Sequence, residues 1–442
     1  MVCGLGGSGE AACRLLLSEG YAVTAVDSGG SESLKQSAGE LERAGVRVVL
    51  GTPVPPDAMY EMCVVSPGIP LDAPLLRNVE QQGWPMISEL EFGWSRFKGK
   101  TAAVTGSNGK STAVKWLAES LREAGYRAEP AGNYGVPACQ AVLEQPGLDW
   151  LVLEVSTFQM ETTEHFRADA AILLNIHPNH LDRHGSMDRY RFLKSRLFAR
   201  SRPEDACITP LMLQKDMQSL SEGLGRWLTF GVESQADFRF ENGWVVKGGQ
   251  HLADLRGTHF DNEVLGLAGA AVVAALEACE IPSSCAAKAA AKFTPLAHRM
   301  QPVGEIRGVR FINDSKATNL SAMAAALRML PKGVRLIAGG LVKEKDFGFV
   351  KELLSQKVRG VYLIGKASDE MALAWKDAVP CVPCGILEDA VNRAWADAMP
   401  GEIVLLSPAC ASYDQFRNFE ERGDRFIRSV GKLSAENAHK LN

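Results

Sequence analysis

Residues 100–112 read Lys-Thr-Ala-Ala-Val-Thr-Gly-Ser-Asn-Gly-Lys-Ser-Thr, and an amphipathic run follows them. Residues 101–105 are apolar or β-branched, which predicts a short buried strand. Val114, Leu117 and Leu121 then recur at the spacing of one helix face. A glycine-rich turn with Lys-Ser-Thr between a strand and a helix is typical of a nucleoside triphosphate site.

This turn has a physical reason to bind phosphate. Glycines let backbone N–H groups face the phosphates, a helix N-terminus adds a positive dipole, a lysine neutralises charge and a hydroxyl binds Mg²⁺. The usual pattern has glycine where this chain has Val104, so the loop is a shorter variant. We predict that the following residues bind the nucleotide: Gly106, Ser107, Asn108, Gly109, Lys110, Ser111 and Thr112.

The composition limits what the chain can be. Its 442 residues are enough for two or three domains, and a charge of −4 without a long basic run argues against a nucleic-acid partner. No apolar stretch approaches bilayer length and no secretory leader is evident, so we expect a soluble cytoplasmic protein with no membrane partner. The ten cysteines are scattered as reduced thiols would be. Cys381-x-x-Cys384 alone is a weak sign of a redox or zinc site.

The first predicted domain covers residues 1–91 and begins with a second glycine-rich turn, Gly4-Leu-Gly-Gly-Ser-Gly9. A strand pattern ends at Asp27, and the combination matches a dinucleotide-binding βαβ unit. Taken alone this turn would indicate NAD. Residues 63–70 add a strand and a stiff turn with backbone donors. We expect a Rossmann-like domain that binds a phosphorylated ribose, with the nucleotide left open.

The middle domain, residues 92–295, continues from the phosphate loop. An apolar strand over residues 150–155 carries Glu154 near its end, where Mg²⁺ would need a carboxylate. The next strand leads to His180, and the residues alone leave open whether this histidine is structural or faces the nucleotide. A β-rich stretch with a hairpin turn at Asn242-Gly243 and an alanine-rich helical run complete this domain.

The last domain, residues 296–442, alternates strands and helices, which predicts another doubly wound parallel sheet. Polar loops follow its strands at residues 313–319, 339–343 and 407–416. Ligands bind beyond the carboxyl ends of such strands, so these loops suit an anionic substrate. The predicted fold is therefore α/β in three domains: a Rossmann-like N-terminal domain, a central P-loop ATPase-type domain and a C-terminal Rossmann-like domain.

The chain resembles the Mur ligases over nearly its whole length. The motifs that carry the resemblance are Thr105-Gly-Ser-Asn-Gly-Lys-Ser-Thr112, Leu153-Glu-Val-Ser-Thr-Phe-Gln159, Asn175-Ile-His-Pro-Asn-His-Leu-Asp182, His298-Arg299, Asn313-Asp-Ser-Lys-Ala-Thr-Asn319 and Leu406-Ser-Pro-Ala-Cys-Ala-Ser412. The last two are similar to the loops of the members that add D-glutamate. The resemblance implies an ATP-dependent ligase of peptidoglycan precursor synthesis that joins D-glutamate to UDP-N-acetylmuramoyl-L-alanine through an acyl phosphate. It also implies two Mg²⁺ ions and a monomer.

The resemblance further implies a role for individual residues. The catalytic set would be Lys110, Glu154, His180, Lys194 and His298. The Mg²⁺ ligands would be Ser111, Glu154, His180 and a carbamylated Lys194. Further nucleotide contacts would be Asn262, Arg299 and Asp314. The UDP-substrate would contact Gly7, Ser8, Asp27, Ser28, Ser66, Asn133 and Gln159, and D-glutamate would contact Lys316, Thr318, Lys343, Ser412, Tyr413 and Phe419. Leu265 stands where the family pattern has a second asparagine after Asn262.

Three other interpretations remain open at this point. A sister Mur enzyme or a folate polyglutamate synthase would share the phosphate loop, but residues 313–319 argue against it. An NAD-dependent oxidoreductase would use the Gly4 turn and leave Lys110 without a role. A non-catalytic nucleotide sensor would bind ATP without releasing phosphate in response to an amino acid.

Overall fold

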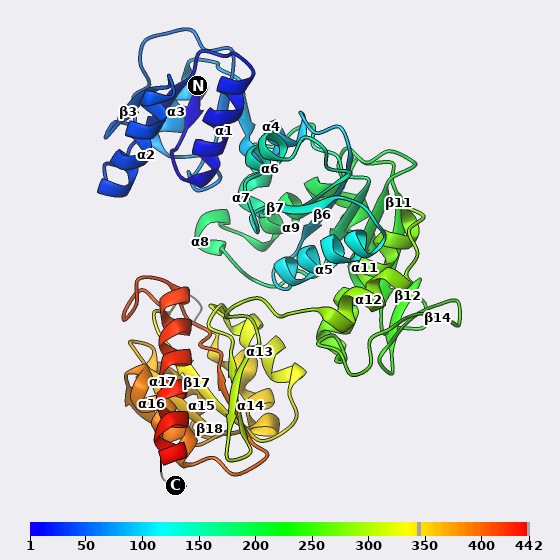
Figure 1. Cartoon of the computed structure of the whole chain (residues 1–442), viewed down its shortest axis with the longest axis vertical. Coiled ribbons are helices and arrows are strands. Elements are labelled where there is room, and N and C mark those ends of the chain that lie inside the picture. Colours follow the sequence, from blue (N-terminus) through cyan, green and yellow to red (C-terminus); the bar gives the residue numbers. More distant parts are fainter. Residues whose placement is uncertain (343–345, 440–442) are drawn as a thin grey trace. The chain divides into compact units, whose positions relative to one another are not determined.

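The computed structural model describes residues 1–342 and 346–439. Strands of the described residues form three sheets, one in each predicted domain (Figure 1). The three-domain α/β fold class is therefore confirmed. The chain divides into two compact units, Met1–Asp261 with Gly266–Lys292 and Asn262–Leu265 with Phe293–Asn442. The first two predicted domains thus share the first unit.

The first sheet is entirely parallel, in the order β3-β2-β1-β4-β5. Its strands are β1 (Val2–Cys3), β2 (Thr24–Asp27), β3 (Arg47–Leu50), β4 (Cys63–Val65) and β5 (Met86–Ser88), with helices α1 (Gly7–Ser18), α2 (Glu32–Arg43), α3 (Pro74–Gln81) and α4 (Glu89–Trp94). Side chains alternate between two cores because successive strand residues face opposite sides of a sheet. Val2 packs with α1 residues such as Leu15, whereas Cys3 packs with α3 residues such as Leu76. This domain is doubly wound, as a Rossmann-like domain should be.

The central sheet has the order β14-β13-β12-β11-β10-β9-β6-β8-β7. Its strands are β6 (Lys100–Thr105), β7 (Ala128–Gly132), β8 (Trp150–Glu154), β9 (Ala170–Leu173), β10 (Ala206–Pro210), β11 (Arg226–Gly231), β12 (Phe238–Glu241), β13 (Trp244–Lys247) and β14 (Gln250–Asp254). Strands β6 to β12 pair in parallel, and β12, β13 and β14 form an antiparallel edge. The hairpin turn at Asn242-Gly243 is confirmed, with φ of 49° and 80°.

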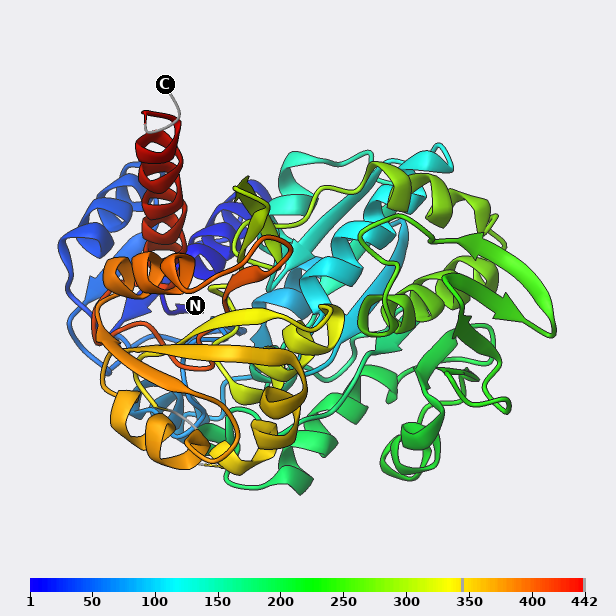
Figure 2. The same cartoon turned by 90° about the horizontal axis from the view of Figure 1, so that it is seen from below.

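The helices of the central domain are α5 (Lys110–Glu123), α6 (Ala138–Glu144), α7 (Thr157–Met160), α8 (Leu181–His184), α9 (Met187–Ser195), α10 (Gln214–Leu220), α11 (Glu263–Ala278) and α12 (Ser284–Lys292), with 3-10 turns at Arg196–Phe198 and Leu211–Leu213. Helix α5 lies against the sheet (Figure 2). Its predicted apolar face is buried, with Val114, Leu117 and Leu121 at most 2% exposed.

The third sheet has the order β15-β16-β20-β17-β18-β19. Its strands are β15 (Gln301–Ile306), β16 (Val309–Asn313), β17 (Val334–Gly339), β18 (Val358–Ile364), β19 (Cys381–Gly385) and β20 (Ile403–Leu406). Its helices are α13 (Leu320–Met329), α14 (Lys351–Lys357), α15 (Ser368–Trp375), α16 (Leu387–Ala396) and α17 (Phe419–His439), with a 3-10 turn at Phe347–Val350. One core packs α13 to α15 against one face, and another packs α16 and α17 against the other. The doubly wound arrangement is confirmed, although the edge strand β15 is antiparallel.

The thiols and the helices bear on two expectations from the sequence. All ten cysteines are free thiols, and the Cys381 and Cys384 thiols in β19 donate to the carbonyls of Val379 and Val382. Among the described helices, none combines the length and apolar character that crossing a membrane requires.

Candidate functional site

The phosphate loop lies between β6 and the first turn of α5. Gly106 has φ of 154° and Gly109 has φ of 83°, a backbone region that glycine adopts readily and other residues rarely do. The backbone N–H groups of Ser107 and Asn108 donate to the side-chain oxygen of Asn175, at 3.0 and 2.9 Å. The Asn175 amide returns a 3.1 Å hydrogen bond to the Asn108 carbonyl. Asn175 therefore braces the loop from the end of the neighbouring strand β9.

Lys110 lies along this loop. Its ammonium donates to the carbonyls of Gly106 and Ser107, at 2.9 and 3.2 Å. The cation is thus held against the glycine turn, at the N-terminal end of α5 where the helix dipole favours negative charge. A phosphate bound there would meet a lysine and a helix N-terminus together.

A carboxylate lies beside the loop hydroxyl. Ser111 Oγ donates to Glu154 Oε2 at 2.5 Å, and the Asn133 amide donates to Glu154 Oε1 at 2.6 Å. Parallel pairing of β6 with β8 places Val104 opposite Glu154, which brings the end of β8 to the phosphate loop. Gly132, with φ of 92°, leads into Asn133, and a Cβ there would lie 2.5 Å from the Glu154 carbonyl oxygen. The Gly132 turn thus depends on the absence of a side chain.

Lys194, at the end of α9, is buried in the same domain. It is 2% exposed, and its ammonium lies 3.5 Å from Thr105 Oγ1 and 4.6 Å from the centroid of the Tyr190 ring. Burial, reinforced by the charge of Lys110, holds the pKa of Lys194 well below its ordinary value, although Glu154 opposes the shift. A lowered pKa raises the fraction of the amine that is neutral and nucleophilic.

Tyr190 is a residue of this site that the sequence analysis missed. Its hydroxyl lies 3.0 Å from the hydroxyl of Ser107 in the phosphate loop. Ser107 Oγ also donates to the carbonyl of His177, at 2.9 Å. The signal available in the sequence was the position of Tyr190 one helical turn before Lys194, on the same face of the helix.

His180 stands at the start of α8. It has φ of 55°, and its ring centroid lies 4.9 Å from that of Phe158 in an edge-on contact. Within the described ranges, no three His, Cys, Asp or Glu side chains converge on a point that suits a metal ion. Mg²⁺ characteristically takes one or two protein carboxylates and completes its shell with phosphates and water. The pair Ser111 and Glu154 fits that donor set.

Asp27 and Ser66 shape the glycine turn of the first domain. The Asp27 carboxylate accepts the backbone N–H groups of Leu5 and Gly29, both at 2.7 Å. Ser66 Oγ donates to the Gly4 carbonyl at 3.0 Å. Both side chains therefore hold the backbone that precedes α1. Gly7 and Ser28 are exposed and Ser8 is half-buried, which leaves the start of α1 accessible.

In the second unit, the residues 313–319 loop is tied to neighbouring segments. Asp314 accepts hydrogen bonds from the Met300 N–H at 3.1 Å and the Ser407 hydroxyl at 2.9 Å, and burial raises its pKa to about 7. The His298 ring lies 3.0 Å from the Asn313 amide nitrogen, and burial lowers the pKa of His298.

Lys316 and Phe419 lie together in this unit. The Lys316 ammonium is 3.7 Å from the centroid of the Phe419 ring, and the Lys316 N–H donates to the His298 carbonyl at 3.0 Å. A cation over an aromatic face gains electrostatic stabilisation that limits where the ammonium can move. Ser412 is buried, Tyr413 is 68% exposed, and Thr318 and Arg299 are half-buried. Lys343 lies outside the described residues.

A buried arginine, also missed by the sequence analysis, supports the same loops. Arg422 of α17 is fully buried and donates to Ser315 Oγ at 3.0 Å, the Ser315 carbonyl at 2.7 Å and the Cys410 carbonyl at 3.1 Å. Burial lowers the pKa of Arg422 to about 10, so the guanidinium stays charged at pH 7. It thus bridges the loop after β16 and the loop after β20.

Two predicted ligand contacts act as helix caps. Asn262 Oδ1 accepts the N–H of Leu265 at 3.0 Å, in the first turn of α11. Gln159 Oε1 accepts the N–H of Ser156 at 2.9 Å, which completes a capping box at α7. These contacts fix the side-chain oxygens of both residues.

Comparison with known proteins identifies all three domains. The family model "Mur ligase MurD-like, N-terminal domain" matches residues 1–88, "Mur ligase middle domain" matches residues 104–275 and "Mur ligase, glutamate ligase domain" matches residues 298–410. The UDP-N-acetylmuramoylalanine–D-glutamate ligase of Acidobacterium capsulatum is 38% identical, over 96% of this chain and 94% of that protein. The enzyme of the same name from Koribacter versatilis is 36% identical, over 99% and 98% of the two chains.

Solved structures share the fold. The MurF ligase of Thermotoga maritima in complex with ADP has a TM-score of 0.62 at 16% identity and covers 94% of this chain and 97% of its own. The UDP-N-acetylmuramate–alanine ligase of the same organism has a TM-score of 0.59 at 18% identity and covers 98% and 99%. Full-length relatives and the matched order of domains lead to one conclusion: this chain belongs to the Mur ligase family.

Proposed function

We propose that this chain joins D-glutamate to UDP-N-acetylmuramoyl-L-alanine with ATP, in peptidoglycan precursor synthesis. One observation carries the proposal: the Ser111 hydroxyl of the phosphate loop donates a hydrogen bond to the carboxylate of Glu154. This pair occurs in a chain that is 38% identical, over 96% of its length, to a D-glutamate ligase. The loop has the groups that phosphoryl transfer needs, and the names of the relatives indicate which substrates to propose.

The chemistry has two steps that balance. The carboxylate of the substrate attacks the γ-phosphorus of ATP, and ADP leaves to give an acyl phosphate. The amine of D-glutamate then attacks the acyl carbon, loses a proton and expels inorganic phosphate. Negative charge develops first at the phosphoryl group, and Lys110 would stabilise it; its hydrogen bonds to the loop carbonyls support this role.

The metal ligands in this proposal are Ser111, Glu154, His180 and Lys194. Bound Mg²⁺ would neutralise charge on the phosphates. Lys194 joins the set after its neutral amine adds to CO₂ and releases a proton, which converts a cation into a carbamate anion. The lowered pKa of buried Lys194 supports this step because only the neutral amine reacts.

The first domain would bind the UDP part of the substrate. Its predicted contacts are Gly7, Ser8, Asp27, Ser28 and Ser66, and Asn133 and Gln159 of the middle domain would contact the rest. Asp27 and Ser66 hold the glycine turn through backbone contacts, which leaves the N-terminus of α1 to the diphosphate.

The third domain would bind D-glutamate through Lys316, Thr318, Ser412, Tyr413 and Phe419, together with Lys343 outside the described residues. The contact of the Lys316 ammonium with the Phe419 ring supports the proposal that this ammonium is held in position to bind one carboxylate of D-glutamate. His298 would contact phosphate, and Asn262, Arg299 and Asp314 would contact the nucleotide. We further propose that the protein acts as a cytoplasmic monomer.

Phosphate release from ATP tests this function directly. The purified protein is given UDP-N-acetylmuramoyl-L-alanine and, separately, each amino acid in both the L and D forms. We expect release with D-glutamate alone among them. Equal release with L- and D-glutamate, or release that ignores the amino acid, would refute the proposal.

A further inference from the structure

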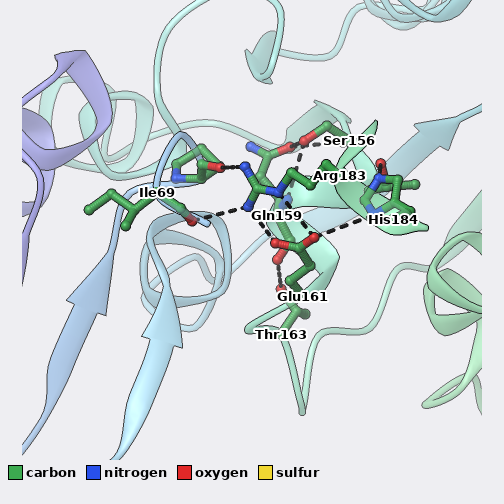
Figure 3. A network of polar contacts seen from close by, with 9 residues as sticks. Ile69, Ser156, Gln159, Glu161, Thr163, Arg183 and His184 are labelled. Atoms are coloured by element: carbon green, nitrogen blue, oxygen red, sulfur yellow. Dashed lines mark hydrogen bonds and ion pairs between the residues drawn. The ribbon is translucent and has the colours of Figure 1, made fainter. Parts of the chain in front are cut away.

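Arg183 of α8 reaches across from the middle domain to the first domain, within the first unit (Figure 3). Its guanidinium donates to the carbonyl of Pro67 at 3.3 Å and to the carbonyl of Ile69 at 3.0 Å. These carbonyls follow β4 directly after Ser66, the residue that pins the Gly4 turn. One side chain thus holds two points of the segment 66–69.

The guanidinium is itself fixed by Glu161. Arg183 Nε donates to Glu161 Oε1 at 3.2 Å, and Arg183 Nη2 forms an ion pair with Glu161 Oε2. The Arg183 side chain is 15% exposed and that of Glu161 is 8% exposed, so solvent screens this pair weakly. The ring of Phe158 lies beneath the guanidinium, 4.1 Å from its central carbon. The two-point pairing with the Glu161 carboxylate and the stacking on the Phe158 ring together set the position and the plane of the Arg183 guanidinium.

The contacts continue from Glu161 to the phosphate loop. His184 Nδ1 lies 3.4 Å from Glu161 Oε1, and His184 Nε2 lies 2.9 Å from Thr157 Oγ1. The His184 ring packs 5.6 Å from the Tyr190 ring, centroid to centroid. Tyr190 in turn meets the hydroxyl of Ser107, so an unbroken set of contacts joins the segment 66–69 to the phosphate loop.

We infer that Arg183 is a positioning residue that fixes the segment 66–69 of the first domain against α8 of the middle domain. The inference rests on the proposed function, in which the first domain holds the UDP end of a substrate whose carboxylate must reach ATP. Reacting groups must approach within about 3–3.5 Å, and a shift of about 1 Å can cost about 100-fold in rate. Arg183 sets the distance between the two binding regions without touching a reacting atom.

The chemistry of the contact explains why arginine is required. Two carbonyls and two carboxylate oxygens are satisfied at once by a planar group with five donors. A lysine in this place keeps the charge, but its single ammonium cannot bridge all of these acceptors. Arg183→Lys should therefore behave like Arg183→Met and differ from the wild type.

The test combines a measurement on the free protein with steady-state kinetics. Arg183→Met, Arg183→Lys and Glu161→Gln are compared with Arg189→Met, which removes an exposed arginine on the nearby helix α9. In the free protein, we expect faster hydrogen exchange at the amides of Ser66, Gly68 and Ile69 in the first three variants and no change in Arg189→Met. With substrates, we expect kcat/KM for UDP-N-acetylmuramoyl-L-alanine to fall about 10- to 100-fold, with KM for ATP within about threefold.

The outcomes separate this inference from the proposed function. Unchanged exchange at residues 66–69 in Arg183→Met would overturn the contact, whatever the protein catalyses. Faster exchange with unchanged kcat/KM, accompanied only by a lower melting temperature, would reduce Arg183 to a structural residue and overturn its positioning role. A wild type that binds no UDP-N-acetylmuramoyl-L-alanine in calorimetry would refute the proposed function instead, and the positioning role would fall with it.

Discussion

The hydroxyl of Ser111 donates a 2.5 Å hydrogen bond to Glu154, joining the first turn of α5 to the end of β8. Asn133 holds the other carboxylate oxygen at 2.6 Å, so both oxygens of a buried carboxylate are directed by neighbours. The Glu154 carboxylate therefore lies beside the hydroxyl that, in phosphate-loop enzymes, is a ligand of Mg²⁺.

Glu154→Gln should preserve the shape of this pair and remove its charge. We expect kcat to fall about 100-fold or more because charge stabilisation during phosphoryl transfer is lost. Phosphate release measures turnover, and calorimetry with ADP in the presence and absence of Mg²⁺ measures binding. Glu129→Gln on the neighbouring strand β7, where the carboxylate pairs with Arg122, is the matched control. Near-wild-type activity of Glu154→Gln would show that this carboxylate is not a metal ligand.

Lys110→Ala should abolish turnover. The ammonium rests on the carbonyls of the glycine turn. In the proposed reaction it faces the transferring phosphoryl group, and losing one group that stabilises charge there costs about 3–4 kcal/mol, or about 100- to 1000-fold. Lys115→Ala is the control because Lys115 lies on the same helix and pairs with Glu119. Activity of Lys110→Ala within about fivefold of the wild type would contradict the assignment of the loop.

Lys194 should carry a carbamate in the active enzyme. Burial lowers its pKa, which raises the fraction of the neutral amine, the form that adds to CO₂. Labelled bicarbonate should give a carbamate carbon signal in the magnetic resonance spectrum that disappears in Lys194→Arg and persists in Lys98→Arg, an exposed control. A fully active Lys194→Arg enzyme would refute the modification.

Glu89 should make stability depend on pH. Its carboxylate is 1% exposed and accepts the Cys139 N–H at 2.7 Å, and burial raises its pKa from 4.5 to about 7. The folded state therefore binds the proton more tightly than the unfolded state, and this contribution to stability is lost as the pH rises from 4.5 to about 7. The slope reaches at most about 1.4 kcal/mol per pH unit.

Thermal melts of Glu89→Gln and the wild type at pH 5 and pH 8 check this expectation. The variant should gain stability relative to the wild type at the higher pH. Glu144→Gln, an exposed position on α6, should show no such gain. A constant difference in melting temperature across this range would contradict the raised pKa.

Local sequence was sufficient where the site is built from consecutive residues. The phosphate loop needs a strand, glycines with positive φ, a lysine and a helix, and all lie within residues 100–123. The same holds for the hairpin at Asn242-Gly243, where the turn residues dictate the backbone. These features were predicted because their physical causes lie next to one another in the chain.

The sequence did not predict contacts between residues that are brought together only by the order of strands in the sheet. Asn175 braces the phosphate loop only because β9 lies beside β6, and that order is not written in either segment. A polar residue ending an apolar strand was the available signal. Tyr190 depends in the same way on how α9 packs. Arg422 is harder still, because an arginine in an amphipathic helix is ordinarily expected in solvent.

Arg422 gives the last prediction. It is a fully buried cation whose three hydrogen bonds end on Ser315 and on the Cys410 carbonyl. Arg422→Met removes the arginine donors from these oxygens, and a buried polar group that loses its hydrogen bond costs about 1–3 kcal/mol. Arg422→Lys retains a buried charge but replaces the planar guanidinium fork with a compact ammonium, so it should also destabilise. Because the bridged loops include the proposed D-glutamate contacts Lys316 and Ser412, we expect KM for D-glutamate to rise about 10-fold or more.

The matched control lies on the same helix. Arg428→Met removes an exposed arginine of α17, and it should leave KM for D-glutamate unchanged. Chemical denaturation measures stability, and phosphate release measures KM for D-glutamate. The two measurements therefore distinguish an effect on folding from an effect on the position of the D-glutamate contacts. If Arg422→Lys matched the wild type in both, a simple point charge would suffice at this position, and the bridge between the two loops would not be what holds the D-glutamate contacts in place.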